Sequence, residues 1–138
     1  MLLAAASALA QQPSSIGRIK IASGEAFVVR QSSQLAAKVG DVLLEADAIR
    51  TGAGGHIGVT LRDDTRVSLG PNSEARLEKF LYSPSDGNVA FILRIVRGLT
   101  AYVSGRIAKL SPDAVRLETP MAIVGVRGTR VVIRVDTP

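Results

Sequence analysis

One arginine in an apolar turn is the residue best suited to bind another molecule. Arg127 lies between Gly125 and Gly128, within a run of valines. A charge in such a neighbourhood needs a partner or access to water. The guanidinium could bind a carboxylate or phosphate of a ligand, or it could satisfy carbonyl groups and acids of its own chain. We favour the structural role, with Thr129 as a strand residue whose hydroxyl bonds locally, and expect Arg127→Ala to lower the melting temperature more than it weakens binding.

The other polar residues form no pattern that supports catalysis. His56 follows a glycine turn, which is typical of a surface histidine. Asp63 and Asp64 are adjacent and are interpreted as turn-forming carboxylates, because a calcium site needs more oxygen ligands at set spacing. The motifs of serine nucleophiles and of phosphate-binding loops are also missing from the sequence. We therefore predict a non-enzymatic protein with no catalytic residue, metal site or cofactor. A second acidic group is interpreted in the same way: Asp41, Glu45 and Asp47.

Composition limits the class of partner. The chain has 138 residues and a formal net charge of +5, from 17 basic and 12 acidic residues. A basic protein attracts nucleic acid, phospholipid head groups or a cell-wall polymer. The basic residues are spread along the chain, however, and aromatic residues make up only 4%, too few to stack on bases. We predict no nucleic-acid partner. The absence of cysteine excludes disulfides and Cys nucleophiles.

The first residues resemble the end of a secretory signal. They are apolar and small, and a small-x-small cleavage site precedes Gln11. We expect residues 1–10 to be a signal-peptide remnant, residues 11–15 a connector and residues 16–136 one β domain; a short helix or frayed tail at the start is the alternative. No later apolar run approaches the ~20 residues of a membrane span. The sequence thus predicts an exported protein, periplasmic or extracellular, without a membrane span in the mature chain.

Alternation of apolar residues predicts an all-β fold. Glycine and β-branched residues are abundant, and short alternating segments recur between turns every eight to ten residues in the middle of the chain. We expect two packed short-stranded sheets or a solenoid-like β-sandwich, with little or no helix. The predicted strands cover residues 16–22, 25–30, 56–62, 66–70, 74–80, 89–97, 99–103 and 114–118.

The prediction also includes details of local structure. Ile19 and Ile21 are expected to share one face of the first strand, and Gly98 is expected to separate two strands, of which the first is central. Residues 31–37 and 105–112 are expected to be loops. Residues 38–51 could form a short helix, but we prefer two short extended pieces around a turn, and residues 119–135 form the closing segment.

An ordered series of short motifs resembles the FecR domain of bacteria. The series begins with Gly-Asp at 40–41 and continues through Ile-Arg-Thr-Gly at 49–52. It ends with Thr119-Pro120 and the Val-Arg-Gly-Thr of residues 126–129. The same likeness includes the segments at residues 59–65, 67–73 and 97–98. The family usually has a glycine after the aspartate at the turn, whereas Asp64 follows Asp63 here.

The resemblance implies an extracytoplasmic all-β domain without catalytic activity. The best-known members also carry a sigma-factor-controlling segment, a membrane helix and a further module, which this sequence does not resemble, so iron-uptake signalling is not expected to carry over. We expect an interaction or scaffold module that binds an unknown envelope protein. The alternative is a binding domain for an anionic envelope polymer, peptidoglycan or lipopolysaccharide. The candidate binding residues are Arg127, Thr129 and Arg50, and the predicted structural motif is Thr119, Pro120, Gly125 and Gly128.

Overall fold

The computed structural model describes residues 14–126 and 128–136 and confirms an all-β fold with little helix. The predictions made for residues 1–13 and for Arg127 therefore lie outside the described residues. Alternating apolar residues form the strands, because this period places one row of side chains in the core and the other in solvent. The strands are β1 (Ser15–Ser23), β2 (Ala26–Arg30), β3 (Ser33–Ala36), β4 (Val42–Leu44), β5 (Ala48–Thr51), β6 (His56–Leu61), β7 (Arg66–Leu69), β8 (Glu74–Ser83), β9 (Asn88–Val103), β10 (Val115–Glu118), β11 (Ile123–Gly125) and β12 (Arg130–Val135).

Helix is confined to three short pieces in the described part of the chain. Two are single 3-10 turns, η1 (Pro84–Asp86) and η2 (Pro112–Ala114), and the third is the five-residue helix α1 (Arg106–Leu110). None of these helices has the length and apolarity that a membrane crossing requires. Residues 105–112, expected to be a loop, thus include one turn of helix, which buries Ile107.

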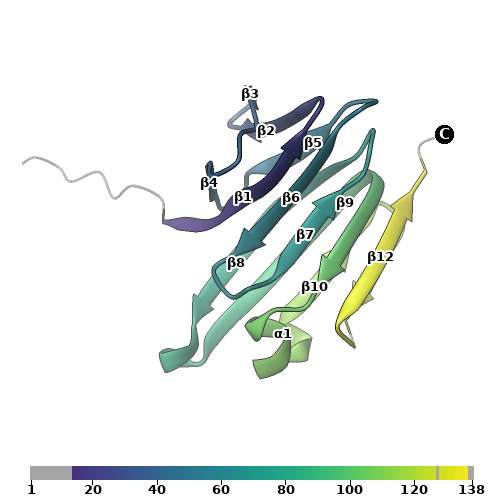
Figure 1. Cartoon of the computed structure of the whole chain (residues 1–138). Coiled ribbons are helices and arrows are strands. Elements are labelled where there is room, and N and C mark those ends of the chain that lie inside the picture. Colours follow the sequence, from purple (N-terminus) through teal and green to yellow (C-terminus); the bar gives the residue numbers. More distant parts are fainter. Residues whose placement is uncertain (1–13, 127, 137–138) are drawn as a thin grey trace, which may run out of the picture.

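The longest strand joins the two halves of one curled sheet (Figure 1). The first part of β9 pairs with β8 and the last part pairs with β7. The bend lies at Gly98, whose φ of 81° is in the left-handed region that favours glycine. A Cβ at this position would lie 2.7 Å from the carbonyl oxygen of Asn72, so the bend also depends on the missing side chain. Gly98 was expected to separate two strands. Instead it lies within β9, which passes from one half of the sheet to the other at this residue.

We name the two halves sheet A and sheet B. Sheet A has the order β4-β1-β6-β7-β9-β12, and sheet B has the order β3-β2-β5-β8-β9-β10-β11. All pairs are antiparallel except β9 and β10, which run parallel. A parallel neighbour requires a crossover connection, which is supplied here by α1 and η2.

Apolar side chains from both sheets meet in one core. Phe91 is fully buried in this core, with the ring of Phe80 edge-on and that of Tyr102 stacked, each at a centroid distance of 6.2 Å. In the strands predicted at residues 56–62, 66–70 and 74–80, the following apolar residues are buried: Ile57, Val59, Leu61, Val67, Leu69, Ala75 and Leu77. The prediction of two short extended pieces within residues 38–51 is confirmed by β4 and β5.

The prediction that Ile19 and Ile21 share one face of the first strand is wrong. Ile19 is fully buried, but Ile21 is 59% exposed, because the register against β6 shifts between these two residues and turns Ile21 outward. After Gly98 the inward residues are Thr100 and Tyr102, so Leu99 faces outward and is exposed. Residues 31–37 were expected to be a loop, yet they contain β3, whose four residues are all exposed.

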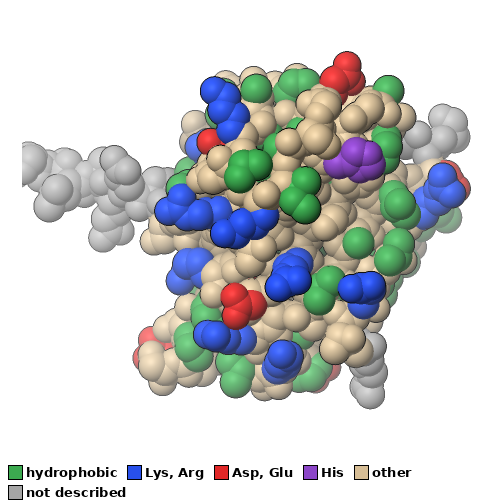
Figure 2. Space-filling view, in the orientation of Figure 1, with side chains coloured by type: hydrophobic (Ala, Val, Ile, Leu, Met, Phe, Trp, Pro, Cys, Tyr) green, Lys and Arg blue, Asp and Glu red, His purple; other side chains and the backbone are tan. Residues whose placement is uncertain are grey.

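The outer face of sheet A is rich in basic side chains. Figure 2 shows Lys and Arg side chains across the middle of this face, together with the single histidine of the chain, His56. His56 is exposed at the start of β6, as expected of a surface histidine. The sheet therefore positions its charged residues in solvent while its alternate residues form the core.

Candidate functional site

The buried carboxylate of Asp47 connects β2 of sheet B with β4 of sheet A. Its Oδ1 accepts a hydrogen bond from Arg30 Nε at 2.9 Å, and its Oδ2 lies 2.7 Å from Arg30 Nη2. Oδ2 also accepts a bond from the backbone N–H of Leu44 at 2.8 Å. Hydrogen bonding to Asp47 is the main cause that raises the pKa of the Arg30 guanidinium above its ordinary value. Asp47 thus holds the turn between β4 and β5 against β2.

The other buried carboxylate, Asp63, organises the turn between β6 and β7. It accepts bonds from Thr65 N at 3.1 Å, Thr65 Oγ1 at 2.7 Å and Ile107 N at 3.1 Å. Asp64 has a φ of 70°, the left-handed conformation that glycine favours and aspartate tolerates. Asp64 therefore adopts a backbone geometry that a glycine would take more easily at this turn.

The acidic residues around β4 do not converge on one point. Glu45 Oε2 accepts a bond from Phe80 N at 3.0 Å, and Asp41 Oδ2 accepts one from Lys38 N at 2.9 Å. In the described part of the chain, no group of three or more His, Asp or Glu side chains could hold a metal ion. Both carboxylates accept hydrogen bonds from backbone N–H groups, which is a structural role.

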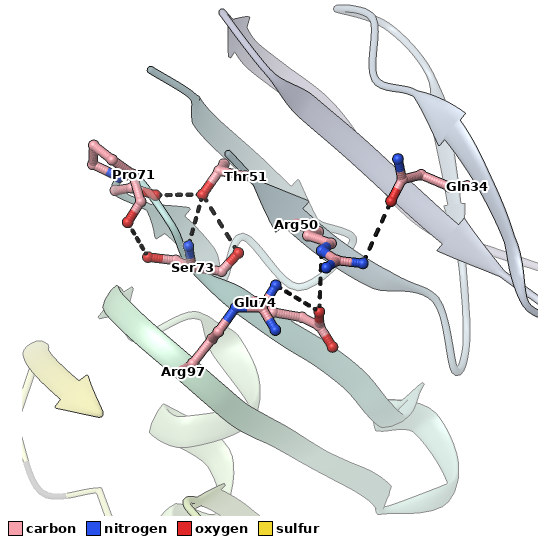
Figure 3. Close-up of polar contacts among 8 residues, drawn as sticks. Gln34, Arg50, Thr51, Pro71, Ser73, Glu74 and Arg97 are labelled. Atoms are coloured by element: carbon pink, nitrogen blue, oxygen red, sulfur yellow. Dashed lines mark hydrogen bonds and ion pairs between the residues drawn. The ribbon is translucent and has the colours of Figure 1, made fainter. Parts of the chain in front are cut away.

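Arg50 belongs to a small charged cluster on the outer face of sheet B (Figure 3). Oε1 of Glu74 lies 3.5 Å from Arg50 Nε and 3.5 Å from Arg97 Nη2. Arg50 Nη1 also donates to Gln34 Oε1 at 3.5 Å. The three charged residues face one another because β5, β8 and β9 place them in register. Exposed pairs at this distance contribute little stability, so the cluster mainly orients the guanidinium groups.

A shallow hollow adjoins this cluster. It has a volume of about 290 Å³. Two cations and one anion beside it leave the cluster with a net positive charge, which suits an anionic group of a ligand. The residues around the hollow are Phe27, Gln34, Arg50, Thr51, Gly52, Asn72 and Arg97.

The Thr-Pro of the closing segment makes a tight turn. Thr119 Oγ1 accepts bonds from the backbone N–H of Met121 at 3.2 Å and of Ala122 at 3.0 Å. The Thr119 N–H donates to the carbonyl of Ala122 at 2.8 Å. The turn joins β10 to β11, so residues 119–135 form two strands in different sheets.

The second part of the closing segment carries the chain from sheet B to sheet A. Gly128 has a φ of 114°, whereas Gly125 lies in β11 and does not have a positive φ. The carbonyl of Gly128 accepts a bond from Ser104 Oγ, and that of Thr129 accepts one from Ser104 N, both at 2.8 Å. Thr129 itself is exposed. The role of Arg127, between these residues, stays a prediction because it lies outside the described residues.

Gly125 and Gly128 also border a hollow of about 840 Å³ between the closing segment and α1. Its lining combines apolar residues such as Ile123 and Val126 with one acidic and one basic residue. This mixture does not indicate one class of ligand.

Three arginines that sequence reasoning missed lie in one row across sheet A. The strand registers align Arg18 with Thr60, Thr60 with Arg66, and Arg66 with Val103. Val103 is aligned with Arg130 on the last strand. We call these five residues the arginine row. The three arginines are exposed, and only the strand order brings them together, so charge spacing along the sequence could not reveal the row.

A family model described as FecR protein matches residues 47–138, about two-thirds of the chain. The match begins at the buried carboxylate of Asp47 and includes the β6–β7 turn, the β9 bend and the closing segment. No curated protein and no solved structure was found to match the chain. The chain therefore belongs to the FecR protein family.

Proposed function

We propose that this FecR domain is a non-catalytic module that binds an extended segment of a protein partner in the cell envelope. Family membership supports an interaction role. The two buried carboxylates support it as well, because hydrogen bonds within the fold already occupy them. Function is then expected at the surface, in backbone or side-chain groups that the fold leaves open.

The observation that carries the proposal is the free edge of β12. Ser104 N–H donates to the carbonyl of Thr129, and hydrogen-bonded pairs alternate with non-bonded pairs in an antiparallel ladder. Val131, Ile133 and Val135 therefore bond to β9, while the backbone groups of alternate residues point away from it. No described strand pairs with that edge. An open edge of this length can add a strand from a partner.

The side chains on β12 specify the chemistry of the partner strand. Arg130 and Arg134 flank Val132, which is 58% exposed. Like charges would face each other if two copies paired through this edge, which disfavours self-association. A partner strand with acidic residues on either side of an apolar one would complement it.

Proline substitution tests this edge selectively. Val132→Pro removes an N–H that β9 does not use, so the fold should persist while partner capture from an envelope extract falls by about tenfold. The matched control is Ala36→Pro, which removes an equivalent free N–H from the outer edge of β3. Equal capture by Val132→Pro and the parent protein, with both folded, would refute binding at β12.

Export is part of the proposal. It is supported by the apolar run of residues 1–10 and by the association of the family with the cell envelope. Fractionation of cells that express the gene, followed by N-terminal sequencing, should find the mature protein outside the cytoplasm with Gln11 near its start. Recovery of the uncut chain from the cytoplasm would contradict it.

A second candidate function is the binding of an anionic envelope polymer. The specific observation in its favour is the arginine row, because no carboxylate lies within it. The rows of sheet B differ: Glu74 lies between Arg50 and Arg97, and Glu118 is aligned with Arg94. Retention on isolated sacculi that salt abolishes would support this function, whereas retention that persists at high salt would oppose it.

A further inference from the structure

We propose that the outer face of sheet A binds a linear polysaccharide that carries one carboxylate per disaccharide, laid along the arginine row. The proposal rests on the second candidate function and names the polymer class and its site. Its three contact points are Arg18 on β1, Arg66 on β7 and Arg130 on β12.

The spacing of the row favours an acidic glycan. One strand separates Arg18 from Arg66 and another separates Arg66 from Arg130. Neighbouring strands lie about 4.8 Å apart, so the arginines repeat about every 9.6 Å. This repeat is close to the length of one disaccharide in an extended glycan. It is much wider than the spacing of phosphates in nucleic acid, about 3.4 Å along each strand of a duplex.

The charge of this face is largely uncompensated. Lys20 and Arg62 lie beside the row at adjoining hollows. Asp64 is the carboxylate that borders these two hollows, and it forms an ion pair with Arg106, whose Nη2 lies 3.4 Å from Asp64 Oδ2. Lys20, Arg62, Arg66 and Arg130 form no ion pair with any described residue. Arg18 Nη1 donates to the carbonyl of Gly40 at 3.1 Å, which leaves the other N–H groups of Arg18 open. Guanidinium groups with open N–H donors can bind carboxylates bidentately.

The surface next to the row leaves space for sugar rings. The adjacent positions of the central strands are small: Gly58 on β6 is aligned with Ser68 on β7, and Ser68 with Ala101 on β9. A hollow of about 710 Å³ lies over Gly58 and Ser68 and is bordered by Lys20, Arg66 and the exposed side chain of Ile21, which lies beside Gly58. A second hollow, of about 260 Å³, continues past Arg18. The low aromatic content of the chain argues against base stacking at this site.

Binding of hyaluronan fragments tests the proposal, because this glycan has one carboxylate per disaccharide. Titration calorimetry at about 50 mM salt should detect binding that weakens strongly as salt is raised. The variant Arg18→Gln/Arg66→Gln should lower the affinity by about tenfold or more. The matched control Arg76→Gln/Arg94→Gln removes the same charge from exposed positions of sheet B and should change the affinity less than about twofold.

Three outcomes would overturn the proposal. The first is equal weakening by both variants, which would show that net charge alone attracts the polymer. The second is that polygalacturonate, polyphosphate or phosphatidylglycerol vesicles bind to the arginine row as tightly as hyaluronan does. That result would show that the row does not select one carboxylate per disaccharide. The third is no binding of hyaluronan by the folded parent protein.

A fallback variant and a comparison with partner capture allow the test to give a clear result. Arg66→Glu alone serves if the double variant unfolds, since the Arg66 side chain makes no hydrogen bond or ion pair with the described residues. Arg18 and Arg66 both lie off β12, so their loss should not change capture of the protein partner. Loss of glycan binding with intact partner capture, or the reverse, then separates this inference from the proposed function.

Discussion

Asp63 Oδ2 accepts a hydrogen bond from the backbone N–H of Ile107 at 3.1 Å, across 44 residues of sequence. The same oxygen accepts a second hydrogen bond from the hydroxyl of Thr65 at 2.7 Å. One fully buried carboxylate therefore fixes both the β6–β7 turn and the start of α1, the helix that allows β10 to run parallel to β9. This contact explains why a short helix persists in an otherwise all-β domain.

The substitution Asp63→Asn should destabilise the domain by about 2 kcal/mol, because an amide N–H₂ replaces one acceptor that faces a buried backbone N–H. Asp64→Asn is the matched control. Its side chain is exposed and, among the described residues, pairs only with Arg106, and asparagine tolerates the positive φ, so the change should stay within about 0.5 kcal/mol. Urea unfolding measures both values. Equal effects of the two substitutions would refute the role of Asp63.

Substitution by alanine should destabilise the domain strongly at Gly98 and only slightly at Gly125. At Gly98 a Cβ would collide with Ser73 and would lie 2.7 Å from the carbonyl of Asn72, at a φ of 81°. We expect Gly98→Ala to cost about 3 kcal/mol or more. At Gly125 an added Cβ would meet no atom of the described residues within 4 Å, so Gly125→Ala should cost less than about 0.5 kcal/mol. Thermal unfolding of both variants checks the contrast, and a stable Gly98→Ala would contradict the bend.

Tyr102 predicts a loss of stability at high pH. Burial is the main cause that raises the pKa of its hydroxyl above the ordinary value of 10.0, and it outweighs the opposing effect of the neighbouring Ser104. Since the folded pKa is higher than the unfolded one, its contribution is fully present below about pH 10 and is lost as pH rises toward the folded pKa. The free energy of unfolding should therefore fall above about pH 10 in the parent protein and fall less in Tyr102→Phe. Parallel pH profiles would contradict this assignment.

Much of the fold follows from local pattern. The alternation in β6 and β7 fixes which residues enter the core, because both strands keep their apolar row on the inner face. The pattern fails where the backbone departs from it, at the irregularity before Ile21 and at the bend of Gly98. Neither shift changes residue composition, so the sequence alone does not reveal it.

The surface features could be predicted less well. Arg50 was a candidate from its motif, and the structure explains its orientation through Glu74 and Gln34. The arginine row depends on the order β1-β6-β7-β9-β12, which places distant segments side by side. The free edge of β12 likewise depends on which neighbour each strand finds. Strand order is set by long-range pairing, so local sequence patterns do not predict the arginine row or the free edge of β12.

Hydrogen exchange of the β12 amides tests the proposed interaction most directly. In the free domain, the amides of Val131, Ile133 and Val135 should be protected by β9, whereas those of Arg130, Val132 and Arg134 should exchange rapidly. Addition of the partner captured through this edge should protect the second set of three and leave the first set unchanged. Partner binding that leaves the amides of Arg130, Val132 and Arg134 in rapid exchange would contradict the account.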